Sequence, residues 1–187
     1  MRVISGKNKG RKIIPPIDKN TRPLRDMVKE SIFNLIEHSS KFSVAISNEN
    51  ILDLFAGSGS FGLECHSRGA KNVTFIESYA KVLKVLKENI ANLDSNNSCK
   101  IIEIDCFDYF KLLTQIHDKF EIIFMDAPYR ENKINLLIDK IIEKKLLNNN
   151  GILIIHRHKK DNVNISKKLN ILDTRNYGIS KIIIGNY

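Results

Sequence analysis

The sequence lacks the long apolar runs, paired cysteines and low-complexity stretches that mark several large classes of protein. No apolar stretch approaches the length of a membrane span, and the first residues lack the apolar block of a signal peptide. Cys65, Cys99 and Cys106 are scattered, odd in number and without metal-ligand spacing. These absences argue against a membrane protein, a disulfide scaffold and a metal site, and they predict free thiols in a reducing cytoplasm.

Acidic residues are scarce relative to basic ones. The chain has 30 lysines and arginines against 21 aspartates and glutamates, a formal net charge of +9. Lysine-rich chains can be basic through codon bias alone, but here the cations crowd the first 25 residues and few acids interrupt them. Such a segment suits a polyanionic partner, and Lys7, Lys9, Arg11 and Lys12 are the candidate RNA-binding residues.

The 187 residues, 42% of them hydrophobic and 27% charged, suit one globular domain with a small appendage. Alternating strand and helix patterns predict an α/β fold, a mainly parallel sheet with helices on both faces. The expected strands are residues 51–54, 73–77, 100–104, 121–126, 151–156 and two runs that end at 182–184, joined by a turn at 177–180. The expected helices after the first strand are residues 79–93, 107–117, 132–147 and a short one near 162–169.

Before the first strand, the sequence predicts a basic β-hairpin and a helix. Residues 1–16 read as the hairpin, with a loop too polar to join a core and a stop at Pro15 and Pro16. Residues 22–38 read as the helix, with Pro23 in its first turn. Its buried face is expected to carry Met27, Val28, Ser31, Ile32, Leu35 and Ile36.

A glycine-rich turn follows the first predicted strand of the sheet. Gly57, Gly59 and Gly62 fit a G-x-G-x-x-G pattern, in which glycines permit positive φ and let backbone amides approach a ligand. The pattern fits a dinucleotide or S-adenosylmethionine (SAM), and a tight structural turn would look the same. Asp53 favours SAM, because an acid there repels a pyrophosphate but can receive an ammonium group. Glu77, ending the next strand, is placed to bond ribose hydroxyls.

A second motif, Asp126-Ala127-Pro128-Tyr129, follows a buried strand. The Asp126 carboxylate and the Ala127 carbonyl can each accept one N–H of a planar exocyclic amine, and Tyr129 can stack on the ring that carries it. Pro128 biases Ala127 towards an extended conformation. Since loops after parallel strands meet at one edge of a sheet, this clamp, the glycine turn, Glu77 and Asp105 should form one site.

Nearly the whole chain resembles the RsmD-type methyltransferases, which methylate the N2 amine of a guanine in bacterial 16S ribosomal RNA. The matching segments are residues 1–7, 10–12, 21–23, 26, 28–30, 33–34, 53–59, 62–64, 67–70 and 76–77. The family usually has proline where this chain has Ala127, and threonine where it has Leu24. The resemblance implies a class I, Rossmann-like SAM methyltransferase with a seven-stranded sheet, and no metal.

The resemblance also assigns roles to residues and divides the chain. Residues 1–40 would form an RNA-binding extension, and residues 41–187 the methyltransferase domain. Asp126, Ala127, Pro128 and Tyr129 would be catalytic. The expected SAM contacts are Arg22, Asp53, Phe55, Ala56, Gly57, Ser58, Gly59, Glu77, Asp105, Cys106, Phe107 and Asp126.

The expected partner is 16S rRNA, the small ribosomal subunit or its assembly intermediate. The protein itself is expected to be a cytoplasmic monomer that binds no membrane. Three other functions stay open on the sequence. A DNA adenine-N6 methyltransferase needs a similar loop and clamp, although nothing here is large enough for a separate DNA-recognition domain. A glutamine-N5 methyltransferase usually begins its clamp with asparagine. A catalytically weak rRNA-binding assembly factor is favoured only by Ala127.

Overall fold

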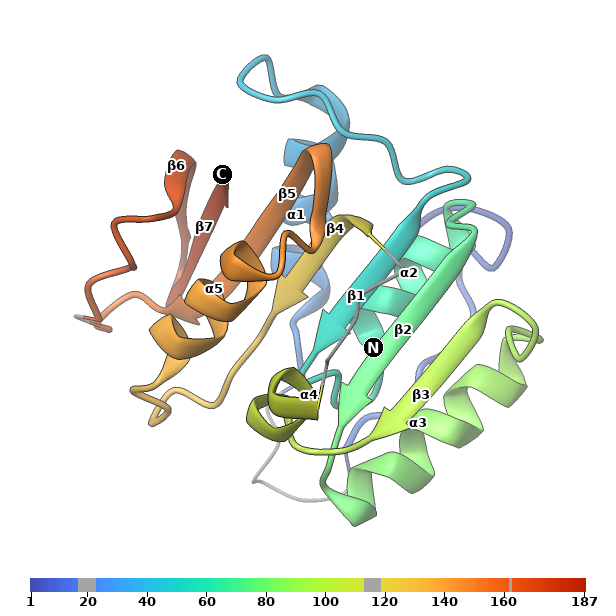
Figure 1. Cartoon of the computed structure of the whole chain (residues 1–187). Helices are drawn as coiled ribbons and strands as arrows, with labels where there is room; N and C mark the ends of the chain where they lie inside the picture. Colours follow the sequence, from blue (N-terminus) through green and yellow to red (C-terminus); the bar gives the residue numbers. More distant parts are fainter. Residues whose placement is uncertain (17–22, 113–118, 162) are drawn as a thin grey trace.

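The computed structural model describes residues 1–16, 23–112, 119–161 and 163–187. One seven-stranded sheet forms its centre, in the order β3-β2-β1-β4-β5-β7-β6 (Figure 1). Strands β1 to β5 are parallel, and β7 joins β5 and β6 in antiparallel pairing. The strands are β1 (Asn50–Leu54), β2 (Asn72–Glu77), β3 (Cys99–Glu103), β4 (Phe120–Met125), β5 (Leu147–His158), β6 (Asn170–Tyr177) and β7 (Ser180–Asn186). The predicted fold class is confirmed.

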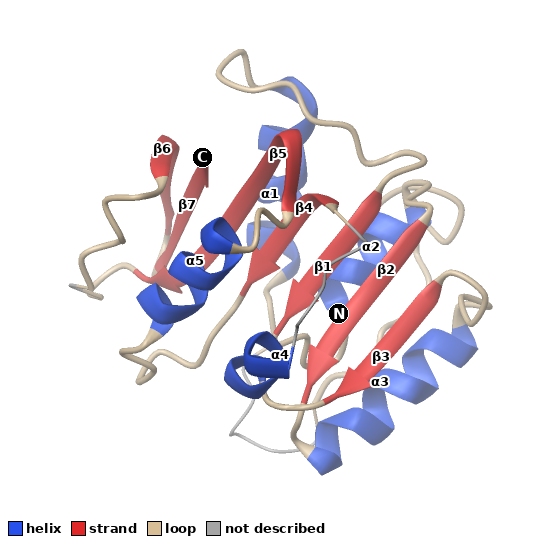
Figure 2. Ribbon diagram, in the orientation of Figure 1, coloured by secondary structure: helices blue, strands red, loops and turns tan. Residues whose placement is uncertain are grey.

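Helices cover both faces of the sheet, because successive side chains of a strand point to opposite faces. Ile122 and Phe124 of β4 belong to one hydrophobic cluster, and Ile123 and Met125 to the other. Figure 2 shows α4 and α5 in front of the sheet and α1 and α2 behind it. The helices are α1 (Asp26–His38), α2 (Ser60–Ser67), α3 (Ala80–Asn92), α4 (Cys106–Leu112) and α5 (Ile134–Glu143).

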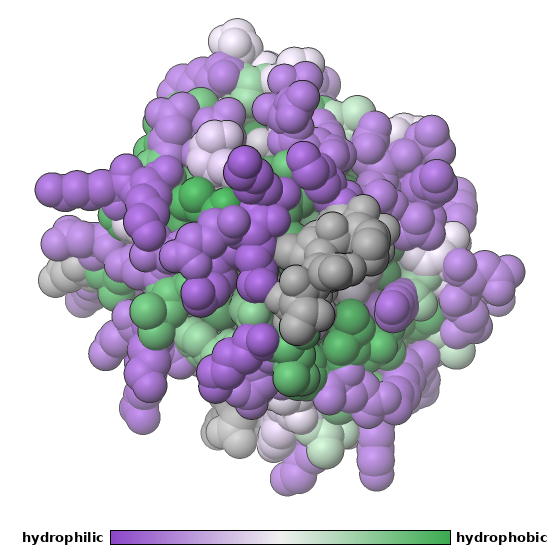
Figure 3. Space-filling view, in the orientation of Figure 1, coloured by the Kyte–Doolittle hydropathy of each residue, from purple (hydrophilic) through white to green (hydrophobic). Residues whose placement is uncertain are grey.

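The surface in the same orientation is mainly hydrophilic, with apolar side chains in small separate patches (Figure 3). None of the helices within the described part of the chain is long and apolar enough to cross a membrane.

The first helix is shorter than predicted. It begins at Asp26, because Arg25 has an extended backbone with φ −65° and ψ 142°. Pro23 therefore precedes the helix, and Arg22 lies outside the described residues. The prediction that Met27 is buried is also wrong, since its side chain is 61% exposed. The buried face consists of Val28, Lys29, Ile32, Phe33 and Ile36.

Two later helices also differ from the prediction. Helix α5 ends at Glu143, because Lys145 adopts a left-handed φ of +52°, and β5 begins at Leu147. The short helix expected near 162–169 is wrong for residues 163–169, which form no helix. Their polar groups are satisfied by α5 instead, since Asn135 accepts the Ser166 N–H at 2.9 Å. The end of the helix predicted over 107–117 lies partly outside the described residues.

The N-terminal hairpin forms, with one antiparallel bridge between Arg2 and Lys12 in place of two strands. Val3 and Ile13 are 1% and 2% exposed and join the hydrophobic cluster that contains α1 and α2. The expectation that the loop stays outside any core is wrong for Asn8, which is 8% exposed. The division at residue 40 stays a prediction.

Charged groups of α1 and α2 hold the hairpin in place. The Glu64 carboxylate accepts the Ile4 N–H at 2.7 Å and the Ser5 N–H at 2.9 Å. Lys29, fully buried, lies 3.5 Å from Glu64 and donates to the Arg2 carbonyl at 2.7 Å. Burial lowers the pKa of Lys29, and the negative charge of Glu64 partly offsets this. An uncompensated charge here would cost several kcal/mol, so hairpin, α1 and α2 stabilise one another.

Candidate active site

The loops that follow β1, β2 and β4 meet at one edge of the sheet, as predicted. The Ala56 N–H donates to the Ile76 carbonyl at 3.1 Å, and the Asp126 N–H to the Leu54 carbonyl at 3.4 Å. The Gly57 N–H donates to a Glu77 carboxylate oxygen at 2.9 Å. Loops from three neighbouring strands therefore form a single candidate site.

The glycine-rich loop uses its glycines for two different purposes. Gly57 and Gly59 have positive φ values of +57° and +80°, as predicted, and Gly59 leads directly into α2. Gly62 lies inside the helix, and a Cβ there would meet the Phe75 ring at 2.4 Å. For Gly62 the expected role in ligand approach is therefore wrong: its hydrogen side chain lets α2 pack closely on β2. Phe55 also has a positive φ, +57°, which is uncommon for a residue other than glycine.

Asp53 is 1% exposed, and its carboxylate accepts the Gly62 N–H at 3.0 Å. Its pKa is raised well above the usual range, first by burial and then by the negative charges of Asp126 and Glu77. The carboxyl groups of Asp53, Glu77 and Asp126 thus lie close enough together, at the ends of three neighbouring strands, to repel one another. A cationic ligand would relieve their mutual repulsion, whereas a pyrophosphate would increase it. The acids therefore fit the positively charged SAM better than a dinucleotide.

The segment after β3 forms an apolar wall beside the glycine loop. The Phe107 ring packs edge-on against the Phe55 ring, with centroids 6.4 Å apart. The Asp105 carboxylate accepts the Phe107 N–H at 2.8 Å and fixes the start of α4. Cys106 is 2% exposed, and burial raises the pKa of its thiol, so it is a structural thiol rather than a nucleophile.

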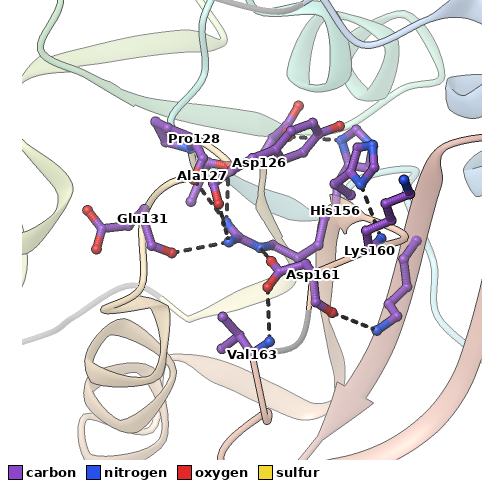
Figure 4. Close-up of polar contacts among 12 residues, drawn as sticks. Asp126, Ala127, Pro128, Glu131, His156, Lys160, Asp161 and Val163 are labelled. Carbon is purple, nitrogen blue, oxygen red and sulfur yellow. Dashed lines mark hydrogen bonds and ion pairs between the residues drawn. The ribbon is translucent and has the colours of Figure 1, made fainter.

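A buried arginine of β5 organises the clamp loop. The Arg157 guanidinium donates to the carbonyls of Ala127 at 3.3 Å and Pro128 at 3.0 Å, and to those of Tyr129 and Glu131, each at 3.1 Å (Figure 4). Its Nε pairs with Asp161. Ala127 is 1% exposed. The arginine restrains the backbone at Ala127, where the family usually has the first of two prolines.

A buried histidine of β5 contacts both clamp side chains. His156, 6% exposed, places Nδ1 2.9 Å from Asp126 Oδ1 and Nε2 2.9 Å from Ser180 Oγ. The Tyr129 ring lies edge-on to His156, with centroids 6.1 Å apart, and to His158, at 5.4 Å. His156 and Arg157 were missed from the sequence. The signal for them was a polar pair that ends the apolar run of residues 151–155.

The basic hairpin side chains are exposed, at a distance from the glycine loop. The Lys7 N–H donates to the carbonyl of Ser67, the last residue of α2, and Arg11 pairs with Asp94 beyond the end of α3. Gly59 directly precedes α2 and Ser67 ends it. The eight-residue helix therefore separates the glycine loop from the contact of the hairpin by about 12 Å. Nearer the clamp, the exposed cations are Arg130, Lys159 and Lys160.

Among residues 1–16, 23–112, 119–161 and 163–187, no group of three histidines, cysteines or acids is arranged to hold a metal ion. The expected absence of a metal stays a prediction, as does the role of each site residue in binding.

The strand order, the acid-lined glycine loop and the clamp define a class I SAM-dependent methyltransferase. Residues 1–186 match the family described as Conserved hypothetical protein 95. The chain belongs to this family, that of the RsmD-type methyltransferases.

Two curated relatives carry the name Ribosomal RNA small subunit methyltransferase D. The protein of Buchnera aphidicola is 34% identical over 165 residues, 88% of this chain and 82% of its own. That of Haemophilus influenzae is 33% identical over 160 residues, 85% of this chain and 79% of its own. A crystal structure of a Haemophilus influenzae protein matches with a TM-score of 0.75 and 29% identity, over 98% of this chain and 96% of that one.

Proposed function

We propose that this enzyme methylates the exocyclic N2 amine of one guanine in bacterial 16S rRNA. The observation that carries the proposal is the position of the Asp126 clamp beside the acid-lined glycine loop at one sheet edge, where the Asp126 N–H bonds to Leu54, the strand residue just before that loop. The names of the relatives, which specify the small-subunit ribosomal RNA, support this substrate. The proposed partner is the small subunit or its assembly intermediate, to which the enzyme would bind as a monomer in the cytoplasm.

SAM would supply an activated methyl group on its sulfonium sulfur. Asp53 would receive its ammonium group directly or through water, Glu77 its ribose hydroxyls, and Asp105 and Phe107 its adenine. The remaining proposed contacts are the backbone and side chains of Arg22, Phe55, Ala56, Gly57, Ser58, Gly59, Cys106 and Asp126. The fit of these residues to SAM rests on the excess of negative charge around Asp53, which the cationic cofactor would offset.

The clamp acts on the amine. The N2 lone pair of guanine is delocalised into the ring, so the amine is a poor nucleophile. Asp126 and the Ala127 carbonyl would each accept one N–H, which aligns the lone pair and stabilises the charge that develops on nitrogen. The Ala127 carbonyl already accepts from Arg157 and has a second lone pair for the substrate. Asp126 would take the proton that the methylated amine releases.

Recognition requires the guanine to leave its stack. Tyr129 would stack on the flipped base, as enzymes that modify bases require. Arg130, Lys159 and Lys160 are exposed beside the clamp and would meet the neighbouring phosphates. Lys7, Lys9, Arg11 and Lys12, which lie at the far end of α2, would hold phosphates at a distance from the target.

Neutralising the hairpin cations should weaken RNA binding without affecting SAM binding. If Lys7, Lys9, Arg11 and Lys12 each contact one phosphate, the alanine variant should lose roughly 3 units of slope in log K against log salt. RNA affinity measured across a salt series tests this, with calorimetry for SAM. The matched control removes four exposed lysines elsewhere, Lys87, Lys111, Lys140 and Lys168. An equal loss in the control would contradict a specific role for the hairpin.

The function itself is tested with labelled SAM and small-subunit particles from a strain that lacks the modification. After digestion of the RNA, we expect the label in N2-methylguanosine. Label in N6-methyladenine of DNA, or in glutamine of a protein, would overturn the proposal in favour of another amine methyltransferase. SAM binding without transfer to any of these would identify an rRNA-binding assembly factor.

A further inference from the structure

His156 is the only histidine of the described chain with hydrogen bonds from both ring nitrogens to side chains. Its Nδ1 lies 2.9 Å from Oδ1 of Asp126, and its Nε2 lies 2.9 Å from the hydroxyl of Ser180. Asp126 follows β4, whereas His156 and Ser180 belong to β5 and β7. Three segments of the chain therefore meet behind the proposed amine-binding carboxylate.

We propose that His156, held by Ser180, is a positioning residue that orients the Asp126 carboxylate towards the substrate amine. This inference rests on the proposed function of Asp126. The contact engages Oδ1, so Oδ2 is the oxygen left for the amine. A carboxylate on a free side chain rotates, and a rotated carboxylate would misalign the lone pair that must attack the methyl group.

The hydrogen-bond network assigns the protons. An ionised Asp126 only accepts hydrogen bonds, so Nδ1 of His156 carries the proton that it donates to Oδ1. The other ring nitrogen, Nε2, lies 2.9 Å from the Ser180 hydroxyl, which can donate to a lone pair or accept a proton there. Ser180 is 4% exposed, so water does not compete readily for this contact. The Asp126 carboxylate, which can only accept, thereby selects a proton on Nδ1, and the Ser180 hydroxyl holds the ring in place from the other side.

His156 also packs against Tyr129, and this second contact supplies the competing explanation. The ring centroids lie 6.1 Å apart in an edge-on arrangement. A purely structural His156 would support Tyr129 by its ring alone. Two substitutions separate the explanations: His156→Asn places an amide N–H near Nδ1 but removes the ring, and His156→Phe keeps a ring but removes the hydrogen bond.

The two substitutions are expected to lower kcat by different amounts. His156→Phe should lower kcat by roughly 10- to 100-fold, as the loss of an orienting partner does elsewhere. Its KM for RNA and its affinity for SAM should change little, because the base and cofactor contacts remain. His156→Asn should retain kcat within about five-fold of the parent, since one good hydrogen bond to the carboxylate survives. Ser180→Ala should lie between the two. A phenylalanine variant faster than the asparagine variant would overturn the proposal and leave His156 as support for Tyr129.

A measurement without substrate keeps this test separate from the substrate assignment. Nitrogen NMR of the histidine rings should show the Nδ1–H tautomer for His156 in the parent, and a changed signal in Asp126→Ala. An Nε2–H tautomer in the parent would overturn the proposal whatever the enzyme methylates. If the parent transfers no methyl group to small-subunit RNA, the proposed function fails, and the tautomer still decides whether His156 bonds to Asp126.

Discussion

Replacing Asp126 with alanine should lower kcat by roughly 100- to 1,000-fold, the usual cost of losing a group that stabilises developing charge. SAM affinity should fall only a few-fold. The physical reason is location: Asp126 is partly exposed at the tip of β4, where the substrate is proposed to bind, whereas Asp53 is buried within β1 beside the glycine-rich loop. Single-turnover transfer of labelled methyl groups and calorimetry with SAM measure the two quantities separately.

Matched substitutions make the result specific. Asp108→Ala removes an aspartate that is exposed on α4 and paired with Lys111, so it should leave turnover unchanged. Tyr129→Ala should cost less than Asp126→Ala, roughly the 1–3 kcal/mol of one base-stacking contact. If Asp126→Ala retains near-parental turnover, the carboxylate only shapes the loop and the clamp mechanism is wrong.

Replacing Arg157 with leucine should lower the free energy of unfolding by about 3–5 kcal/mol, the cost of breaking a buried ion pair. The guanidinium is 2% exposed, contacts four carbonyls of the clamp loop and pairs with Asp161. All of these groups would lose the guanidinium at once, although Pro128 and Asp161 would each keep a backbone N–H donor, from Glu131 and Val163. Urea unfolding followed by circular dichroism measures the change, and methyl transfer below the new midpoint should also fall because the Ala127 carbonyl is released.

Acid sensitivity provides a second readout for the Arg157–Asp161 pair. Burial acts to raise the pKa of Asp161, but hydrogen bonds from the Val163 N–H and Arg157 outweigh it and lower the pKa. A lowered folded pKa means that the pair stabilises the fold above the ordinary pKa of about 4, and that this stabilisation is lost as pH falls. The leucine variant should therefore lose less unfolding free energy than the parent as the pH falls from about 5 to about 2.

The control for Arg157 is Arg175→Leu. Arg175 pairs with Asp173 at 3.0 Å on the edge strand β6, and its side chain is 51% exposed. Asp173 is buried but keeps Lys41 as a second partner at 2.7 Å, so losing the half-exposed Arg175 should cost about 0–1 kcal/mol and this variant should unfold close to the parental midpoint. Equal destabilisation by both substitutions would contradict the role given to the buried arginine.

The sequence predicted the fold because the sheet depends on short-range patterns. Apolar runs, such as residues 122–125, alternated with amphipathic helices at regular spacing. The convergence of Asp53, Glu77 and Asp126 followed from the rule that loops after parallel strands share one edge. Errors arose where long-range contacts override local preference. The left-handed Lys145 ends α5, and residues 163–169 bond to α5 instead of forming a helix.

The supporting residues of the site could not be predicted for a similar reason. His156 contacts Asp126 across 30 positions and Ser180 across 24, and no local pattern encodes such pairs. Gly62 fits the ligand motif equally well whether it faces a ligand or the Phe75 ring, and only the packed helix distinguishes the two. Motifs thus predicted the groups that are proposed to face a substrate, and the fold revealed the groups that hold them.

The docking of the hairpin on α2 fixes an order of events during synthesis. The bond from the Ile4 N–H to Glu64 spans 60 positions, and a Cβ on Gly6 would meet the Ser67 carbonyl at 1.9 Å, so the fit requires a finished helix. At about 5–20 residues per second, α2 leaves the ribosome roughly 3 to 12 seconds after the hairpin segment. During that interval Val3 and Ile13 lack the surface of α2 to pack against. The cationic N-terminus is therefore made first and acquires its shape late, while it emerges beside the ribosomal RNA of the particle that translates it.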